Sequence, residues 1–242
     1  MAEQKEPPIS ESEKKEIIKQ AAGRFLFTAI LMICALFLSA GKLGWWEGWA
    51  YIAVVLSDLL VNRTLLLLKY PDRIQERMDA AKKENVKPWD RVLVPLVAVI
   101  LPLAAWIVAG LDERFGWSPD LPDGIQLIAL AAVLAGILML SRATFINRNF
   151  SSHVRIQSDR GHSVATSGPY RFIRHPGYAG EILSWLAVPV FFSSTWVGIL
   201  TVLAVIAYVI RTALEDRTLQ KELPGYREYA QSVRYRLIPG IW

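Results

Sequence analysis

The residues best suited to chemistry lie in the polar segment 142–181. This segment holds all three histidines of the chain, His153, His162 and His175, among arginines, serines and aromatic residues. A loop of this length is usually either functional or disordered, and its aromatic and turn-forming residues argue against disorder. The histidines do not have the close helical spacing of paired metal ligands, so we expect no metal site here.

A turn pattern closes this segment in the run Arg174–Gly180, which reads RHPGYAG. Its proline stops the preceding element, and Gly177 permits a close approach of the backbone. A helix that begins near Tyr178 would present free N–H groups to an anionic or polar ligand. An ordinary turn into a membrane helix would have the same pattern.

Two further polar patterns follow. Arg211 and Glu215 are four residues apart at the end of the last apolar stretch, so they share a helix face. A surface ion pair has this spacing, but ionisable groups that emerge from an apolar helix are often functional. The stretch from Leu223 to Pro239 is aromatic and basic, which is typical of an interfacial helix.

The elements that must position these residues are apolar. Of the 242 residues, 53% are hydrophobic and 20% charged, and the mean hydropathy is +0.29. The single cysteine, Cys34, excludes a disulfide scaffold and a zinc site built from several cysteines. Membrane helices need about 20 apolar residues. The candidate segments are 25–40, 45–68, 92–111, 125–140, 182–192 and 196–210.

The lysines and arginines are sorted along the chain. Of the 27, 24 lie in the stretches 1–24, 69–91, 142–178 and 211–236, and only two lie in the other loops, 41–44 and 112–124. With six crossings, all four basic stretches fall on one side of a membrane. This pattern matches the positive-inside rule. It explains the basic composition without a nucleic-acid partner and places both termini in the cytoplasm.

We therefore expect an all-α, polytopic membrane helix bundle of about six spans. Residues 1–24 form a cytoplasmic tail with a short helix at 10–20, residues 25–141 form four membrane helices, and residues 142–242 form the catalytic region. The last two short segments are expected to pair as a helical hairpin, with Pro189 kinking the first arm. Residues 70–77 form either an amphipathic helix on the membrane surface or a solvated loop.

Four pieces of the second half, in this order, resemble the isoprenylcysteine carboxyl methyltransferase (ICMT) family. The similarity covers roughly residues 140–242. The pieces are the run Gly161–Tyr170 (GHSVATSGPY), then Arg174-His175-Pro176-x-Tyr178-x-Gly180, then Arg211-x-x-x-Glu215, then Gly225-Tyr226-x-x-Tyr229 with a terminal Arg-x-x-Pro.

The resemblance implies an S-adenosyl-L-methionine-dependent methyltransferase with a cytoplasmic cofactor pocket in its C-terminal half. It also implies a lipophilic or prenylated substrate that enters from the bilayer. Arg211 would face the substrate carboxylate, and Arg211 and Glu215 would be the catalytic residues. The loop between 157 and 170 is shorter than in eukaryotic members. The cofactor contacts implied by the motifs are Gln157, His162, Ser163, Val164, Ala165, Tyr170, His175, Pro176, Gly177, Tyr178 and Glu215.

The chemistry agrees with this expectation and leaves alternatives open. A carboxylate acceptor is already ionised at neutral pH and needs no general base. The planar guanidinium of an arginine can donate two parallel hydrogen bonds to it. Nothing in the chain follows the G-x-G-x-x-G pattern of a soluble nucleotide-binding domain. The alternatives are phospholipid N-methylation, thiol S-methylation, a sterol-reductase-like enzyme that uses NADPH, and a non-catalytic membrane scaffold.

Overall fold

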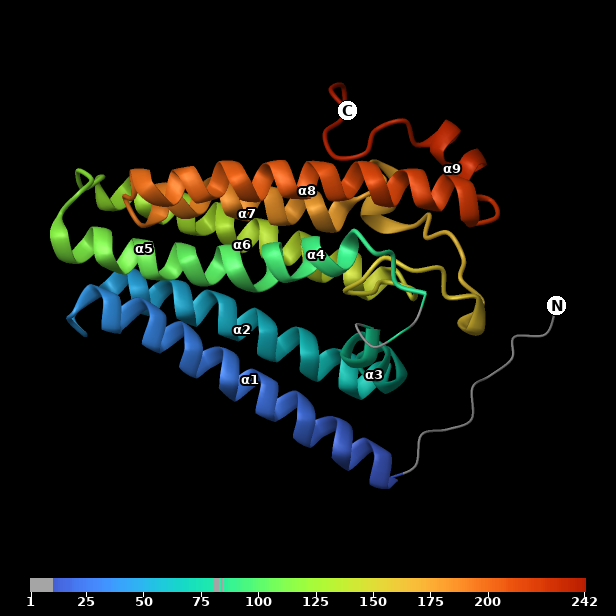
Figure 1. Cartoon of the computed structure of the whole chain (residues 1–242), viewed down its shortest axis with the longest axis horizontal. Helices are drawn as coiled ribbons and strands as arrows, with labels where there is room; N and C mark the ends of the chain where they lie inside the picture. The colour runs from blue at the N-terminus through green and yellow to red at the C-terminus, as the bar shows by residue number, and fades with distance from the viewer. Residues whose placement is uncertain (1–10, 81–82, 84) are drawn as a thin grey trace.

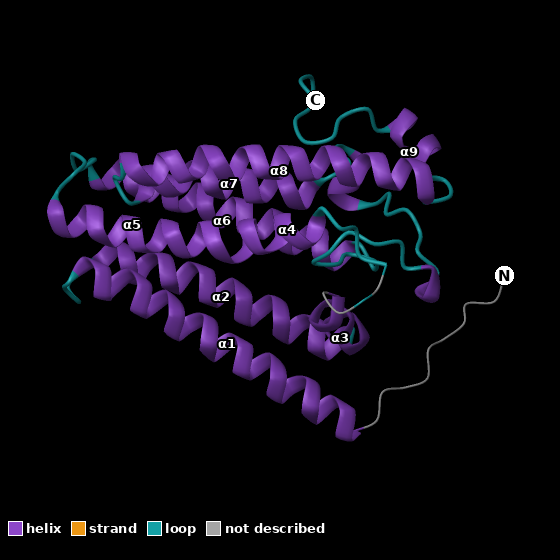
Figure 2. Cartoon of the chain, in the orientation of Figure 1, coloured by secondary structure: helices purple, strands orange, loops and turns teal. Residues whose placement is uncertain are grey.

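The computed structural model describes residues 11–80, 83 and 85–242, and every regular element among them is helical (Figures 1 and 2). The all-α bundle expected from the sequence is confirmed. Two 3-10 turns, η3 (Ser158–Arg160) and η4 (Gly168–Arg171), interrupt the long polar segment. The helices are α1 (Glu11–Ala40), α2 (Trp46–Lys69), α3 (Pro71–Asp79), α4 (Asp90–Pro95), the π-helical η2 (Leu96–Ile100), α5 (Leu101–Phe115), α6 (Asp123–Ile146), α7 (Pro176–Phe191), α8 (Thr195–Glu222) and α9 (Tyr226–Ser232).

Five helical stretches in the described residues are long and apolar enough to cross a membrane. They are α1, α2, the stretch from α4 through α5, α6, and α8. The expected hairpin is formed by α7 and α8, which lie side by side (Figure 1). With 16 residues, α7 is about 24 Å long, less than the ~30 Å of a hydrocarbon core. A count of six spans therefore stays a prediction.

The hairpin packs on α6 through glycines. A Cβ at Gly136 would collide with the carbonyl oxygen of Gly180 and with Ser184, and a Cβ at Gly180 would collide with the carbonyl oxygen of Gly136. The Ser184 hydroxyl donates to the Val133 carbonyl at 3.1 Å. Small residues let membrane helices approach closely, and this contact fixes the first turns of α7 against α6.

The first helix is longer than the apolar segment that predicts it. The tail helix expected at 10–20 and the segment 25–40 belong to one continuous helix, α1. Residue 10 of the expected tail helix lies outside the described residues. No proline occurs between residues 11 and 40, and the single Gly23 costs only about 1 kcal/mol in a helix. The boundaries expected at residues 24 and 141 fall inside α1 and α6.

For residues 70–77 the sequence left a surface helix or a loop open; residues 71–77 lie in α3, and Tyr70 is its N-cap residue. Ile74 packs with Ile17 of α1 and Leu66 of α2. Arg73 donates to the Phe145 carbonyl at 3.0 Å, and Arg77 donates to the Thr144 carbonyl at 2.9 Å. Basic side chains satisfy the open carbonyls of a helix C-terminus, so α3 caps the end of α6.

The two ends of the bundle differ in charge. The beginning of α1, α3, the long segment after α6 and the end of α8 lie at one end, and the α1–α2 and α5–α6 loops lie at the other (Figure 1). The described residues of all four basic stretches therefore meet at the same end, as expected from the sequence. We call this the basic end; it carries the candidate site.

Candidate functional site

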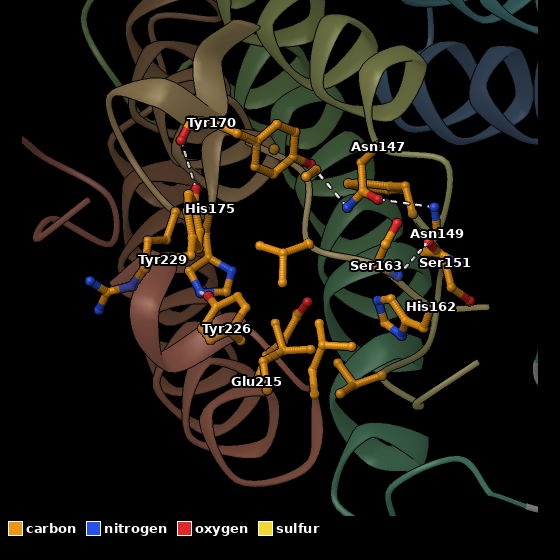
Figure 3. A pocket seen from close by; sticks show the side chains of 18 of the residues that line it. Asn147, Asn149, Ser151, His162, Ser163, Tyr170, His175, Glu215, Tyr226 and Tyr229 are labelled. Carbon is orange, nitrogen blue, oxygen red and sulfur yellow. Dashed lines mark hydrogen bonds between the residues drawn. The ribbon is translucent and has the colours of Figure 1, made fainter. Parts of the chain in front are cut away.

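A cavity with about 750 Å³ of empty space, part of it open to solvent, lies at the basic end. Its walls come from the segment 147–175, the first turn of α7, the last turns of α8 and the beginning of α9 (Figure 3). Side chains distant in sequence face one another across it, with Asn147, Asn149, Ser163 and His162 on one side and His175 and Tyr226 on the other.

Two amides hold the wall formed by residues 147–165. Gln157 Nε2 donates to the Asn149 carbonyl at 2.7 Å, and Asn149 Nδ2 donates to Gln157 Oε1 at 3.5 Å. Asn149 Oδ1 also accepts from the Ser163 N–H at 3.3 Å. Gln157 is 1% exposed and does not line the cavity. The structure places this predicted cofactor contact behind the wall, where it supports the lining residues.

His162 faces the cavity in a defined tautomer. Its Nδ1 lies 3.2 Å from the Gln157 N–H, which donates to it, so the ring proton is assigned to Nε2. Burial, and beside it the charge of Arg155, lower the pKa of His162 to about 4. The ring is therefore neutral at physiological pH, with Nε2–H available as a donor.

The first turn of α7 forms the opposite wall. The helix begins at Pro176, two residues before the expected start near Tyr178, because proline is well suited to the first helical position. The rings of His175 and Tyr178 lie parallel, with centroids 5.8 Å apart. A Cβ at Gly177 would lie 3.1 Å from the Phe150 ring, so glycine permits this side of the cavity to pack tightly.

Asp216 organises the residues beneath this wall, and the sequence analysis did not single it out. The carboxylate is fully buried. It accepts from Arg174 Nε at 2.8 Å, Arg236 Nε at 2.8 Å and the Tyr226 hydroxyl at 3.0 Å. His175 Nε2 lies 3.4 Å from it. Burial and the charge of Asp216 raise the pKa of Tyr226 well above its usual range, which keeps this hydroxyl a donor.

The Arg211–Glu215 pair suggested by the sequence is not the contact that forms. Arg211 Nε donates to Asp90 Oδ1 at 2.7 Å, and its Nη2 donates to Asp90 Oδ2 at 3.2 Å. Glu215 instead accepts from the Tyr178 hydroxyl. The guanidinium carbon lies 5.0 Å from the centre of the Tyr178 ring. Tyr178 thus stands between the arginine and the glutamate and links them.

Most of the residues implied by the motifs come together. Gln157, Pro176 and Arg211 do not line the cavity, although Pro176 begins the helix that supplies two lining residues. Arg211 is 6% exposed and lies behind Tyr178. The implied residues that line the cavity are His162, Ser163, Val164, Ala165, Tyr170, His175, Gly177, Tyr178 and Glu215.

Sequence reasoning missed several lining residues. Tyr226 and Tyr229 belong to a motif that was noted, and they line the cavity from α9. The Tyr229 hydroxyl donates to the Tyr170 carbonyl at 2.7 Å, and burial raises the pKa of Tyr229 to about 12. Asn147 and Asn149 carried no motif. A signal was available in the polar run directly after α6, where asparagines follow an apolar helix.

The described residues contain no group of three or more His, Cys, Asp or Glu side chains placed to hold a metal ion.

The chain was also compared with known proteins. The family model described as "Isoprenylcysteine carboxyl methyltransferase (ICMT) family" matches residues 127–221. This segment runs from α6 into the last turn of α8. The resemblance stated from the sequence is confirmed over residues 140–221, and its last piece, from residue 225 onward, lies outside the match. No curated protein matches the chain.

Proposed function

Since residues 127–221 of this membrane protein carry the segment of the isoprenylcysteine carboxyl methyltransferase family, we propose that it is an S-adenosylmethionine-dependent methyltransferase. The acceptor is the carboxylate of a lipophilic molecule such as a prenylcysteine. The observation that carries the proposal is the cavity itself. Residues of the matched segment and of α9 enclose it at the end of a bundle of apolar helices.

The residues of the cavity fit the cofactor. The parallel rings of His175 and Tyr178 offer an aromatic wall to an adenine ring. The N–H groups of Val164 and Ala165 make no hydrogen bond within the described residues, so they are available to a carboxylate. Glu215 Oε2 is taken by Tyr178, which leaves Oε1 to accept from ribose hydroxyls or from an ammonium group.

The charge of the cavity also suits a cationic donor. S-adenosylmethionine supplies a methyl group on a sulfonium centre. The two lining arginines, Arg155 and Arg174, already pair with carboxylates, while the Glu215 carboxylate lines the cavity and accepts a hydrogen bond from a neutral hydroxyl. Glu215 therefore favours a positively charged ligand at this wall.

We propose that Arg211 orients the acceptor. Its Nη1 makes no hydrogen bond within the described residues. Every fully buried side-chain nitrogen or oxygen among those residues has a hydrogen-bond partner. Since Nη1 has none, it is not fully buried. An acceptor carboxylate is ionised and needs no base. The protein has to hold two reactants in line and exclude water, which is worth on the order of 7–11 kcal/mol.

The basic end is proposed to face the cytoplasm, because loops rich in lysine and arginine remain on that side of a membrane. The acceptor then enters from the bilayer, with its head group at the level of the basic end. We propose that the apolar tail remains among the helices while the carboxylate reaches Arg211.

A second acceptor class is favoured by one observation. Asp90 already neutralises Arg211, and the free oxygen of Glu215 lies at the cavity. An amine acceptor, such as a phospholipid head group, must lose a proton before attack, and Glu215 is the side chain placed to take it. Phospholipid N-methylation is therefore the second candidate. Thiol S-methylation and an NADPH-dependent reduction have no such observation in their favour.

The cofactor is tested first by isothermal titration of the detergent-purified protein with S-adenosylhomocysteine, with NADPH as a comparison. We expect the first ligand alone to bind. Glu215→Gln should weaken this binding about tenfold, because it removes a charge that faces the ligand. The matched control is Glu222→Gln on the same helix, which pairs with Lys87 outside the cavity. Binding of NADPH alone would move the protein to the reductase class.

The acceptor is tested by transfer of labelled methyl from S-adenosylmethionine to N-acetyl-S-farnesylcysteine or to phosphatidylethanolamine. We expect the acid to be methylated and the amine not. Arg211→Ala should abolish transfer and change the affinity for S-adenosylhomocysteine less than about threefold. A parallel loss of both would show that Arg211 supports the cofactor cavity instead of the acceptor.

A further inference from the structure

Asp90 is a buried charge that the matched family segment does not include. It is the first residue of α4, and it is fully buried. Its two oxygens accept from Arg211 Nε and Nη2 at 2.7 and 3.2 Å, and Oδ2 also accepts from the Val154 N–H at 2.6 Å. A buried charge is costly unless its hydrogen bonds are satisfied. The three bonds to Asp90 join α4, α8 and the wall of the cavity.

These bonds fix the plane of the guanidinium. Arg211 Nη2 makes a second bond to the Ser152 carbonyl at 2.7 Å, and the Tyr178 ring lies 5.0 Å from the guanidinium carbon. Nε and Nη2 are therefore both occupied, and Nη1 is the nitrogen left for an acceptor. A bidentate arginine–carboxylate pair sets geometry as well as charge. The orientation of Nη1 is consequently set by Asp90.

Asp90 also sets the net charge that an acceptor meets. Methyl transfer converts a carboxylate into a neutral ester, so attraction to a positive charge is strongest before the reaction. An interaction stronger in the ground state than in the transition state slows the chemical step. The negative charge of Asp90 offsets that of Arg211 and so limits this ground-state attraction.

We propose that Asp90 is a positioning residue for the acceptor. It orients Nη1 of Arg211 toward the acceptor carboxylate and offsets the charge of the guanidinium. The acceptor is then oriented for transfer without an excess of ground-state affinity. This inference rests on the carboxylate acceptor proposed above.

The wall of the cavity has support that is independent of Asp90. The Lys87 N–H donates to the Val154 carbonyl at 3.1 Å, and Asn85 Nδ2 donates to the Ile156 carbonyl at 2.9 Å. Removal of the negative charge at position 90 therefore leaves the segment 154–156 tied to its neighbour. A variant of Asp90 can change the acceptor side while the cofactor side remains in place.

The test compares Asp90→Asn with wild type in methyl transfer to N-acetyl-S-farnesylcysteine. With the arginine less neutralised and no longer aligned, we expect the acceptor KM to fall about threefold and kcat to fall about tenfold or more. The affinity for S-adenosylhomocysteine should change less than about threefold. A merely structural role would lower the melting temperature and cofactor affinity without a fall in KM.

The matched control is Asp112→Asn at the opposite end. Asp112 is also buried and accepts hydrogen bonds, from the Ser118 N–H and hydroxyl at 2.8 Å each, but it lies outside the cavity. The Asp112→Asn change should lower the melting temperature without changing the kinetic constants of the enzyme that remains folded. Kinetics of Asp90→Asn that match this control would overturn the proposal.

Asp90→Glu serves if Asp90→Asn does not fold. It keeps the charge and moves it by one methylene group, so KM should stay near the wild-type value while kcat falls about tenfold. An unchanged kcat would contradict a positioning role.

Failure of the acceptor assignment is recognised separately. If the wild-type protein binds S-adenosylhomocysteine but does not methylate the acid, both the carboxylate acceptor and the positioning role of Asp90 are overturned, because Arg211 would have no carboxylate to orient.

Discussion

His162 shows how its surroundings decide the protonation state of one residue. Burial and the charge of Arg155 lower its pKa from 6.5 to about 4. In the unfolded chain the ring takes up a proton near pH 6.5, while in the folded protein it stays neutral to about pH 4. The unfolded state therefore binds more protons in this window, so stability is lost as the pH falls from 6.5 toward 4.

We expect the melting temperature of the purified protein to decrease between pH 6.5 and about 4, and the decrease to be shallower in His162→Asn. The asparagine side chain keeps an acceptor for the Gln157 N–H, so the loop retains its hydrogen bond. Differential scanning calorimetry at several pH values gives both slopes. Equal slopes in the two proteins would mean that His162 titrates normally in the folded state.

Residues whose partners are far away in the chain could not be assigned from the sequence. Arg211 suggested a pair with Glu215 because the two are four residues apart, but its partner Asp90 is 121 residues away. Asp216 stands next to Glu215 in the same helix and faces a different set of partners. The types of residue at the site could be predicted from local motifs. Their pairing depends on how α4, α8 and the C-terminal segment fold together.

At the scale of elements, apolar length predicted where helices lie and failed at their ends. The helix α1 extends 14 residues toward the N-terminus from the apolar segment at 25–40, because polar residues with good helix propensity continue it. The segment 182–192 is the latter part of α7, whose first turn lies in the motif that carries His175 and Tyr178. Hydropathy detects the buried stretch of a helix, whereas its ends depend on caps and tertiary contacts.

The contact between α6 and α7 gives a prediction at this scale. Gly180→Ala would place a methyl group against the Gly136 carbonyl and push apart two helices that position the cavity. We expect a loss of about 1–3 kcal/mol in unfolding free energy, and a fall in kcat because Tyr178 lies only two residues before Gly180 in α7. Thermal unfolding in detergent and the methyl-transfer assay measure the two effects.

The matched control is Gly198→Ala on α8, where a Cβ would meet only the Pro189 side chain at an ordinary 4.0 Å. This change should be neutral or stabilising by up to about 1 kcal/mol, because alanine favours a helix more than glycine. Equal behaviour of the two variants would show that the α6–α7 contact tolerates a wider separation.

Over the whole molecule, the sorting of charge predicts the orientation in the membrane. The basic end holds the cavity and the described residues of the four basic stretches. Carboxylates gather at the opposite end, among them Glu47, Asp112, Glu113, Asp120 and Asp123. Composition and order of segments were enough to predict this sorting, because each crossing reverses the side of the chain. The depth of α7 in the bilayer could not be predicted, since it depends on packing against α6 and α8.

The orientation and the even number of crossings before residue 158 can be tested together by cysteine labelling in a Cys34→Ser background, since Cys34 is exposed on α1. Single cysteines replace the exposed residues Lys19, Ser158 and Asp120. With a membrane-impermeant maleimide on intact cells, only Asp120→Cys should react, and all three should react after permeabilisation. Labelling of Ser158→Cys from outside would reverse the orientation. If Lys19→Cys and Ser158→Cys reacted from different sides, the number of crossings between them would be odd, whereas the four helical stretches α1, α2, α4–α5 and α6 require an even number.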